Sequence, residues 1–175
     1  RALELVAEGD SAETHLLARN TLGKILLHKG EYSAADEHFA RDVATSQAVG
    51  ASRAELRARL NRAIACMSKG DVDASQTMLE RVLDDAERLG QPRAVLHAVP
   101  NLAALASRRR RYGPALRYWD RALRFPPSLG GRILMAQLIA NAAELRVRLG
   151  LLDHADHVLA FGRRLLGQGM TAARA

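Results

Sequence analysis

Three asparagines recur at one interval in this chain: Asn61, Asn101 and Asn141 follow one another every forty residues. An asparagine amide both donates and accepts hydrogen bonds, so asparagines in register can hold the carbonyl and N–H groups of a bound backbone. Asparagine is also a poor helix former, and its recurrence inside predicted helices favours a binding role. The alternative is that each asparagine caps or bridges neighbouring helices.

Four consecutive arginines, at 108–111, form the densest run of charge in a chain whose net charge is +7. Such a run could contact the phosphates of a nucleic acid. No aromatic residues interleave with the run and no recognition motif accompanies it, which favours a solvated turn between two helices. Nucleic-acid binding is kept only as an alternative.

No grouping of residues stands out as a catalytic or cofactor site. His154 and His157 have the spacing of two metal ligands on one helical turn, but no third ligand accompanies them, which favours an exposed helix face. Gly130-Gly131 lacks the Lys-Ser/Thr continuation of a phosphate-binding loop and is interpreted as a turn between repeats. Because no Ser-His-Asp or Cys-His grouping stands out either, we predict no enzymatic activity, catalytic residue, metal or cofactor.

The forty-residue interval extends to other residue types. Glycine recurs at Gly30, Gly70 and Gly150, with Arg110 at the one missing place. The columns two, five and nine residues further on hold Tyr32, Val72, Tyr112 and Leu152; Ala35, Ser75, Ala115 and Ala155; and Phe39, Leu79, Trp119 and Leu159. Several columns that share one period without an insertion predict stacked supersecondary repeats, which usually hold other molecules.

Each repeat is predicted to be a pair of helices. Apolar residues follow helical spacing over 14–29, Gly30 supplies a left-handed turn, and a second helix follows over about 33–48. The same pattern predicts a partial repeat at 1–10 and full repeats at 13–50, 53–90, 92–130 and 132–169, within a single array that spans 1–175. Pro100 would either bend a helix or mark its later start.

These columns resemble the tetratricopeptide repeat, whose pattern has a small residue after a leucine, a turn glycine, a tyrosine, an alanine and an aromatic residue. The first full repeat matches at Leu22-Gly23, Gly30, Tyr32, Ala35 and Phe39, and the third at Leu102-Ala103, Tyr112, Ala115, Trp119, Ala122 and Pro126-Pro127. The second and fourth repeats are looser, since Arg62 and Ala142 replace the leucine and Ser75 replaces an alanine.

The resemblance implies an all-α fold: a right-handed α-solenoid of antiparallel helix pairs, with about four repeats and an N-terminal partial one. The forty-residue spacing is similar to that of the long variety found in kinesin light chains and bacterial signalling regulators. In this family the first helix of each pair lines an inner groove, and ligands lie along it.

Transferred residue by residue, the family pattern places the three asparagines in this groove. An apolar patch of Leu60, Ile64 and Met67 would receive an apolar anchor, and basic side chains would attract acidic ones beside it. The candidate peptide-binding residues are Lys24, Arg57, Leu60, Asn61, Ile64, Met67, His97, Asn101, Arg108, Asn141 and Arg148. Ala104 and Glu144 fall at further groove positions.

The resemblance therefore implies a scaffold or sensor module that binds a protein or peptide segment and belongs to a larger bacterial signalling or regulatory protein. Self-association through the ends or the outer face stays open as an alternative. The start at Arg1 suggests a piece of a longer protein, and the excess of arginine over lysine suggests a bacterial source. The single cysteine, Cys66, indicates a reducing compartment, and no apolar stretch could span a bilayer, so we predict a cytoplasmic location.

Overall fold

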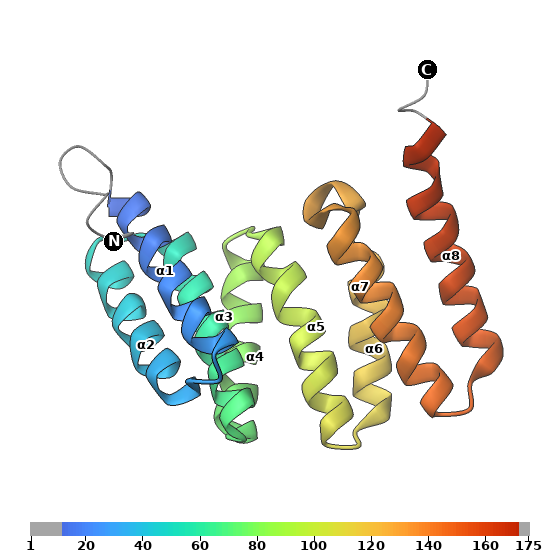
Figure 1. Cartoon of the computed structure of the whole chain (residues 1–175), viewed down its shortest axis with the longest axis horizontal. Helices are drawn as coiled ribbons and strands as arrows, with labels where there is room; N and C mark the ends of the chain where they lie inside the picture. The colour runs from blue at the N-terminus through green and yellow to red at the C-terminus, as the bar shows by residue number, and fades with distance from the viewer. Residues whose placement is uncertain (1–11, 172–175) are drawn as a thin grey trace. The chain divides into compact units, whose positions relative to one another are not determined.

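The computed structural model describes residues 12–171, and all the regular elements among them are helices (Figure 1). They are α1 (Ala12–His28), α2 (Tyr32–Ala48), α3 (Ser52–Lys69), α4 (Val72–Arg88), α5 (Pro92–Arg108), α6 (Tyr112–Ala122), α7 (Pro127–Arg148) and α8 (Leu152–Thr171). The predicted all-α class is confirmed for this part of the chain. The partial repeat predicted at 1–10 lies outside the described residues.

Each full repeat predicted from the sequence contains one pair of helices, from α1 and α2 to α7 and α8. The agreement between predicted repeats and observed helices is poorest at the last pair. Helix α7 begins at Pro127, whereas the last repeat is predicted to begin at residue 132. Gly131 interrupts that helix with a non-helical backbone (φ 75°, ψ 168°), so the longer helical stretch begins at Arg132. The turn expected at Gly130-Gly131 is therefore carried by Gly131.

The same turn closes most of the helices. The turn glycines with positive φ are Gly30, Gly50, Gly70, Gly90 and Gly150. In each turn the glycine N–H bonds to the carbonyl three residues earlier, and the next N–H bonds to the carbonyl five residues before itself. Arg110 makes the same two bonds with its own N–H and that of Arg111. These turns lie twenty residues apart, so two of them produce the forty-residue period.

The chain forms two compact units and passes from one to the other within α5. Unit 1 ends at Ala98 and unit 2 begins at Val99. Helix α5 runs through Pro100, so the alternative in which the helix starts later is wrong. Proline has no N–H, and Pro100 therefore removes the helical donor to the carbonyl of Leu96. The boundary therefore falls close to a residue at which α5 lacks one internal hydrogen bond.

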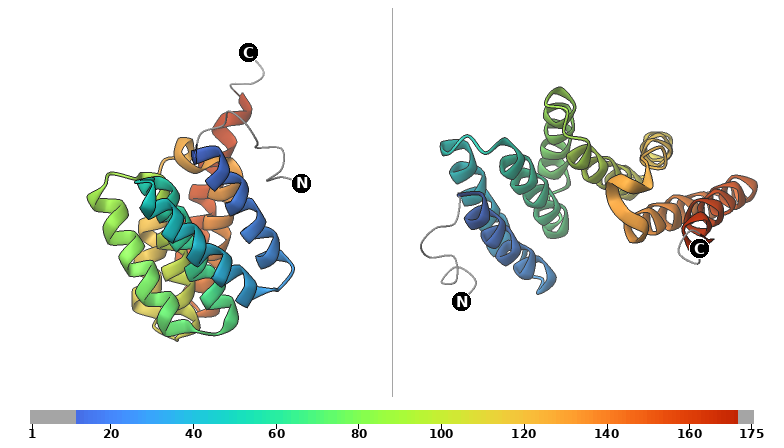
Figure 2. Two further views of the ribbon diagram at one scale, coloured as in Figure 1. Left: turned by 90° about the vertical axis from the view of Figure 1, so that its left-hand side faces the viewer. Right: turned by 90° about the horizontal axis from the view of Figure 1, so that it is seen from above.

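In unit 1, α2 packs against both α1 and α3, and α3 also packs against α4 (Figures 1 and 2). Ala35, Phe39 and Ala65 form the fully buried centre of unit 1. Gly23 of α1 faces the ring of Phe39 so closely that an added Cβ would lie 2.4 Å from Cε1. The small residue of the Leu22-Gly23 pair thus lets α1 and α2 approach.

Ion pairs join the helices of unit 1 across their polar edges. Asp36 of α2 accepts from Arg62 (2.8 Å) and Lys69 (3.2 Å) of α3. Asp85 of α4 accepts from Arg59 of α3 at 2.9 Å. Burial acts to raise the pKa of Asp36, but the hydrogen bonds and charges of Arg62 and Lys69 outweigh it and hold that pKa below its ordinary value.

Acid is expected to destabilise unit 1 through Asp36. A carboxyl whose pKa is lower in the folded chain contributes stability above its unfolded pKa, and this contribution disappears as the pH falls through the folded pKa. Urea unfolding should therefore show a free energy that decreases below about pH 4, and Asp36→Asn should flatten the decrease. Asp84→Asn, at an exposed position of α4, is the control. If the free energy of unfolding depends on pH in the same way in both variants, Asp36 is not the cause of the decrease.

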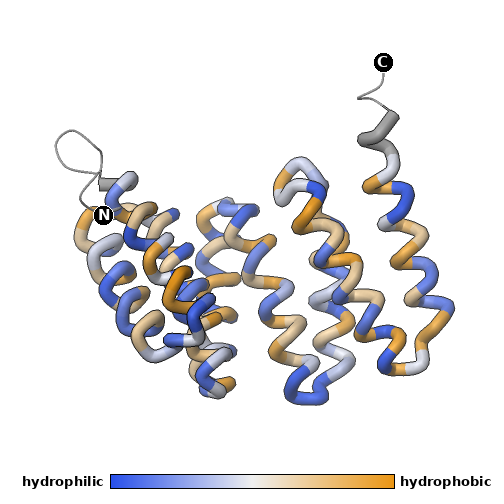
Figure 3. The backbone as a smooth tube through the Cα atoms, in the orientation of Figure 1, coloured by the Kyte–Doolittle hydropathy of each residue, from blue (hydrophilic) through white to orange (hydrophobic). Residues whose placement is uncertain are grey.

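Unit 2 is built by α7 packing against α6 and α8. Ala115, Trp119 and Ala122 form the buried stripe of α6. On the other side of α7, Gly162 of α8 lies so close to Ile139 that an added Cβ would be 2.7 Å from Cγ2. The helices of Figure 3 carry apolar and polar residues in alternation, as helices with one buried stripe require.

We expect Ala115→Leu to destabilise unit 2 by about 1–3 kcal/mol, because Ala115 is fully buried where extra methyl groups force neighbours out of place. Chemical unfolding followed through the fluorescence of Trp119, the one tryptophan of the chain, measures the change. Ala140→Leu adds the same volume at an exposed position of α7 and serves as the control. Equal stability of the two variants would show that Ala115 does not lie at the close helix contact that the repeat pattern predicts.

Candidate ligand-binding site

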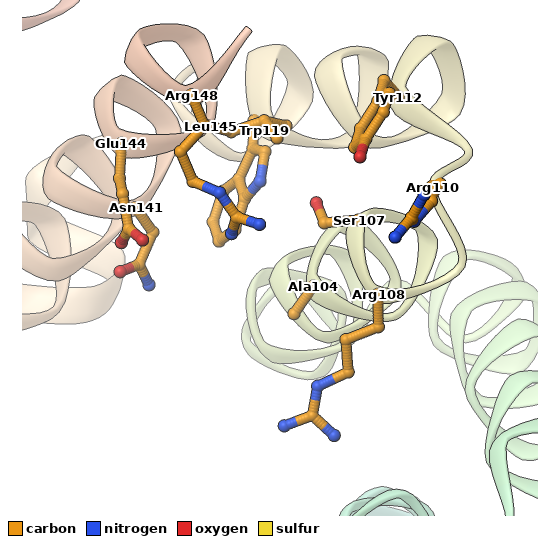
Figure 4. A pocket seen from close by; sticks show the side chains of 10 residues that line it. All are labelled: Ala104, Ser107, Arg108, Arg110, Tyr112, Trp119, Asn141, Glu144, Leu145 and Arg148. Carbon is orange, nitrogen blue, oxygen red and sulfur yellow. The ribbon is translucent and has the colours of Figure 1, made fainter.

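A pocket of about 540 Å³ lies within unit 2, among α5, α6 and α7 (Figure 4). Its volume falls in the range of about 300–1,000 Å³ that is usual for ligand sites. It is lined by Ala104, Ser107, Arg108, Arg110, Tyr112, Trp119, Asn141, Glu144, Leu145 and Arg148.

Helical spacing explains how one wall of the pocket forms. Asn141, Glu144, Leu145 and Arg148 stand at i, i+3, i+4 and i+7 along α7, which is one face of a helix. Tyr112 and Trp119, seven residues apart on α6, share another face. The last turns of α5 and the turn that follows complete the lining. Three elements that are adjacent in the sequence thus build the whole site.

The floor of the pocket is apolar and its rim is charged. Trp119 is buried, with 4% of its surface exposed, whereas Arg110, Arg148 and Glu144 are exposed. The hydroxyl of Ser107 donates to the carbonyl of Ala103 at 2.8 Å, so its proton is already engaged. Three guanidinium groups against one carboxylate give the lining a positive charge, which favours acidic ligands.

The three arginines reach separate points of the pocket. In Figure 4, Asn141, Glu144 and Arg148 come from α7 on one side, and Arg110 and Tyr112 stand on the other. The side chain of Arg108 extends away from both groups. This arrangement suits an extended ligand with charges at several points better than one compact anion.

Three of the residues predicted from the sequence, Arg108, Asn141 and Arg148, meet in this pocket. Asn101, also in unit 2, is half-buried on α5 and does not line it. The remaining predicted residues belong to unit 1: Lys24, Arg57, Leu60, Asn61, Ile64, Met67 and His97. The predicted set is therefore divided between the two units.

Asn61 adopts the bridging alternative. Its Nδ2 donates to Oδ1 of Asn20 at 3.0 Å, and both side chains are buried between α1 and α3. Nδ2 of Asn20 has no hydrogen-bond partner among the described residues. The bridge uses one of the two N–H donors of the Asn61 amide, and burial separates the side chain from a ligand.

The predicted apolar anchor site of unit 1 is largely covered. Leu60 and Met67 are buried, and Ile64 and Arg57 are half-buried. Lys24 and His97 are exposed, and partial desolvation lowers the pKa of His97, as do the charges of Lys24 and Arg93. A ligand would find little open apolar surface at Leu60 and Met67, and their role in binding stays a prediction.

Five lining residues were not predicted as site residues: Ser107, Arg110, Tyr112, Trp119 and Leu145. Trp119 and Tyr112 match columns of the repeat pattern, which carry no separate signal of ligand binding. Arg110 carried a signal of its own, because it stands where glycine recurs in the other turns. Its φ is 56°, and it is the one residue other than glycine with positive φ among residues 12–171.

Arg110→Gly is expected to stabilise unit 2 by about 1 kcal/mol, because a side chain in the left-handed region carries a strain that glycine does not. Thermal unfolding of the variant should give a melting temperature several degrees higher. Arg110→Ala keeps the strain and should not show the increase. A lower melting temperature for Arg110→Gly would contradict the strain argument.

The structure also shows where the arginine run and the histidine pair lie. The arginine run ends α5 at Arg108 and continues through the turn before α6. His154 and His157 are both exposed, and Nδ1 of His157 lies 2.6 Å from the carbonyl oxygen of Asp153. Within the described range, no three His, Cys, Asp or Glu residues are grouped so as to hold a metal ion. No helix in that range is long and apolar enough to cross a membrane.

Comparison of the sequence with protein-family models and with curated proteins finds no match.

Proposed function

We propose that this chain binds a segment of another protein, and that the pocket of unit 2 is its principal site. The observation that carries the proposal is the meeting of Arg108, Asn141 and Arg148 in one pocket over Trp119. These residues were selected for peptide binding from sequence columns alone, and they lie far enough apart in the chain that only folding brings them together.

The chemistry of the lining supports binding of a polypeptide. Asn141 is exposed, so its amide can donate to a backbone carbonyl and accept from a backbone N–H. The arginines attract acidic side chains, and the buried Trp119 and Leu145 support the base of the pocket. Amide and guanidinium groups hold and orient a ligand, which is the work of a binding module.

The repeat architecture is part of the same proposal. A similar turn joins the two helices of each pair, and small residues such as Gly23 and Gly162 let neighbouring helices approach closely. These features support a tetratricopeptide-like α-solenoid in which first helices present ligand-binding faces. We propose that the module serves a larger signalling or regulatory protein in the cytoplasm.

Selection from a displayed library of random peptides tests the proposal. Wild-type protein should enrich a set of peptides, and Asn141→Ala should bind them about tenfold more weakly, because a peptide group would lose its partner. Gln137→Ala, at an exposed position one turn earlier on α7 and outside the pocket lining, is the matched control. Failure to enrich any peptide, or equal binding by both variants, would contradict the proposal.

Self-association is the second candidate function, and the exposed apolar residues of α8 favour it. Leu152 and Leu159 are 60% and 41% exposed and stand two turns apart on one face of the helix. We expect Leu152→Glu to reduce the apparent mass in light scattering if this face joins two copies. A mass equal to one chain in the wild type at high concentration would exclude this candidate.

A further inference from the structure

We infer that the segment bound in the unit 2 pocket carries two acidic side chains separated by a short spacer, with Arg110 and Arg148 each receiving one acid. This inference rests on the proposed function and specifies the ligand chemistry of the same site. It adds Arg110 to the binding residues and gives it the role of setting specificity.

The first support is the state of the arginines themselves. Arginines at the helix contacts of this protein are paired: Arg19 with Asp42, Arg62 with Asp36, and Arg146 with Asp120. Arg110 and Arg148 line the pocket, and within residues 12–171 neither makes an ion pair. A planar guanidinium matches a carboxylate with two parallel hydrogen bonds. The two open arginines are therefore the natural receptors for acids of a ligand.

The second support is the separation of the two arginines across the pocket. Figure 4 shows Arg148 on the α7 side and Arg110, with Tyr112, on the opposite side. Each guanidinium can pair with one carboxylate through two parallel hydrogen bonds. Two acids held apart along one segment therefore match this arrangement.

The third support is the backbone of Arg110. Five other turns of the same form use glycine, and Arg110 alone places a large side chain at positive φ. A residue that breaks a local rule without a packing reason indicates a functional role. Arg110 is exposed and is not one of the buried residues of unit 2, so packing gives no reason for it. Ligand contact does.

Trp119 allows a direct test, because its fluorescence is the only tryptophan signal of the chain and originates in the pocket. The probes are blocked peptides in which two glutamates flank one, two or three alanines, with glutamine in place of glutamate as the matched control. A peptide with one of these three distances between the glutamates should produce a saturable change in fluorescence. The Kd of that peptide should be about tenfold or more below the Kd of its glutamine counterpart.

The variants separate a specific contact from general attraction. Arg110→Gly should raise the Kd of the best glutamate peptide about tenfold, although the variant is expected to be at least as stable as the wild type. Arg111→Ala removes the same charge from a neighbouring exposed position outside the lining and should change the Kd less than about twofold.

Equal binding of glutamate and glutamine peptides, or equal effects of Arg110→Gly and Arg111→Ala, would overturn the inference. Displacement of the glutamate peptide by a short single-stranded oligonucleotide at lower concentration than by the same peptide would also overturn it. Peptides from the displayed library that require Asn141 but lack paired acids would overturn the inference and leave the proposed function standing.

Discussion

Phe39→Ala is expected to destabilise unit 1 by about 3–5 kcal/mol, which is a large fraction of the total stability of a domain. Phe39 is fully buried, and its ring fills the space that Gly23 leaves between α1 and α2. Removing the ring opens a cavity that the flanking helices cannot close, because their backbones are already close together. Urea unfolding followed by circular dichroism, together with hydrogen exchange of α1 and α2 amides, measures the loss.

Two further variants sharpen this test. Ile25→Ala removes an apolar side chain of α1 that is 47% exposed, and it should cost much less than Phe39→Ala. Gly23→Ala inserts a Cβ against the same ring and should also destabilise unit 1, through crowding. A stable Phe39→Ala protein with wild-type amide protection would show that α1 and α2 do not pack as described.

Trp119→Ala should have the second largest effect, a loss of about 3–5 kcal/mol from unit 2 together with loss of ligand binding. Trp119 is buried on α6 and also forms the floor of the pocket, so stability and binding depend on the same ring. Since the variant has no tryptophan left, circular dichroism must follow its unfolding and calorimetry its binding.

Trp119→Phe separates the two roles. A phenyl ring retains much of the apolar contact, so this variant should lose less stability than Trp119→Ala while its smaller floor weakens peptide binding. If Trp119→Phe folds and binds every selected peptide as tightly as the wild type, the indole ring does not contribute to the ligand site.

The helices could be predicted from the sequence because turn glycines mark their ends. Glycines that recur every twenty residues fix the helix lengths, and the apolar columns fix which face is buried. The all-α class and the boundaries of α1 to α5 followed from these local rules, whereas α6 ends at Ala122 without a glycine and α7 begins at Pro127. The interruption at Gly131 and the division of α5 at Ala98 depend on contacts between helices, which spacing alone does not show.

The candidate site could be predicted only in part, and the asparagine column shows why. Asn61 and Asn141 occupy the same column, yet Asn61 is buried in a bridge and Asn141 is exposed in the pocket. Asn61 finds an acceptor in Asn20 of α1, whereas the side chain of Asn141 makes no hydrogen bond within residues 12–171. A column identifies a helix face, but the partner across the interface determines whether that face is free.

The contribution of the arginine turn was missed for a similar reason. A run of four arginines indicates charge without showing which side chain reaches a neighbouring helix. Only the fold places Arg110 in the pocket lining with Arg108 and Arg148, beside a tryptophan whose sequence signal is only its place in a column of the repeat pattern.

Amide chemical shifts of the isotope-labelled protein, recorded while a library-selected peptide is added, test the central claim most directly. Binding in the pocket predicts that the largest shifts fall at lining residues of unit 2, such as Ala104, Asn141 and Arg148. Shifts concentrated around Ile64 and Met67 of unit 1, or along the exposed face of α8, would contradict the claim and assign the ligand to another surface.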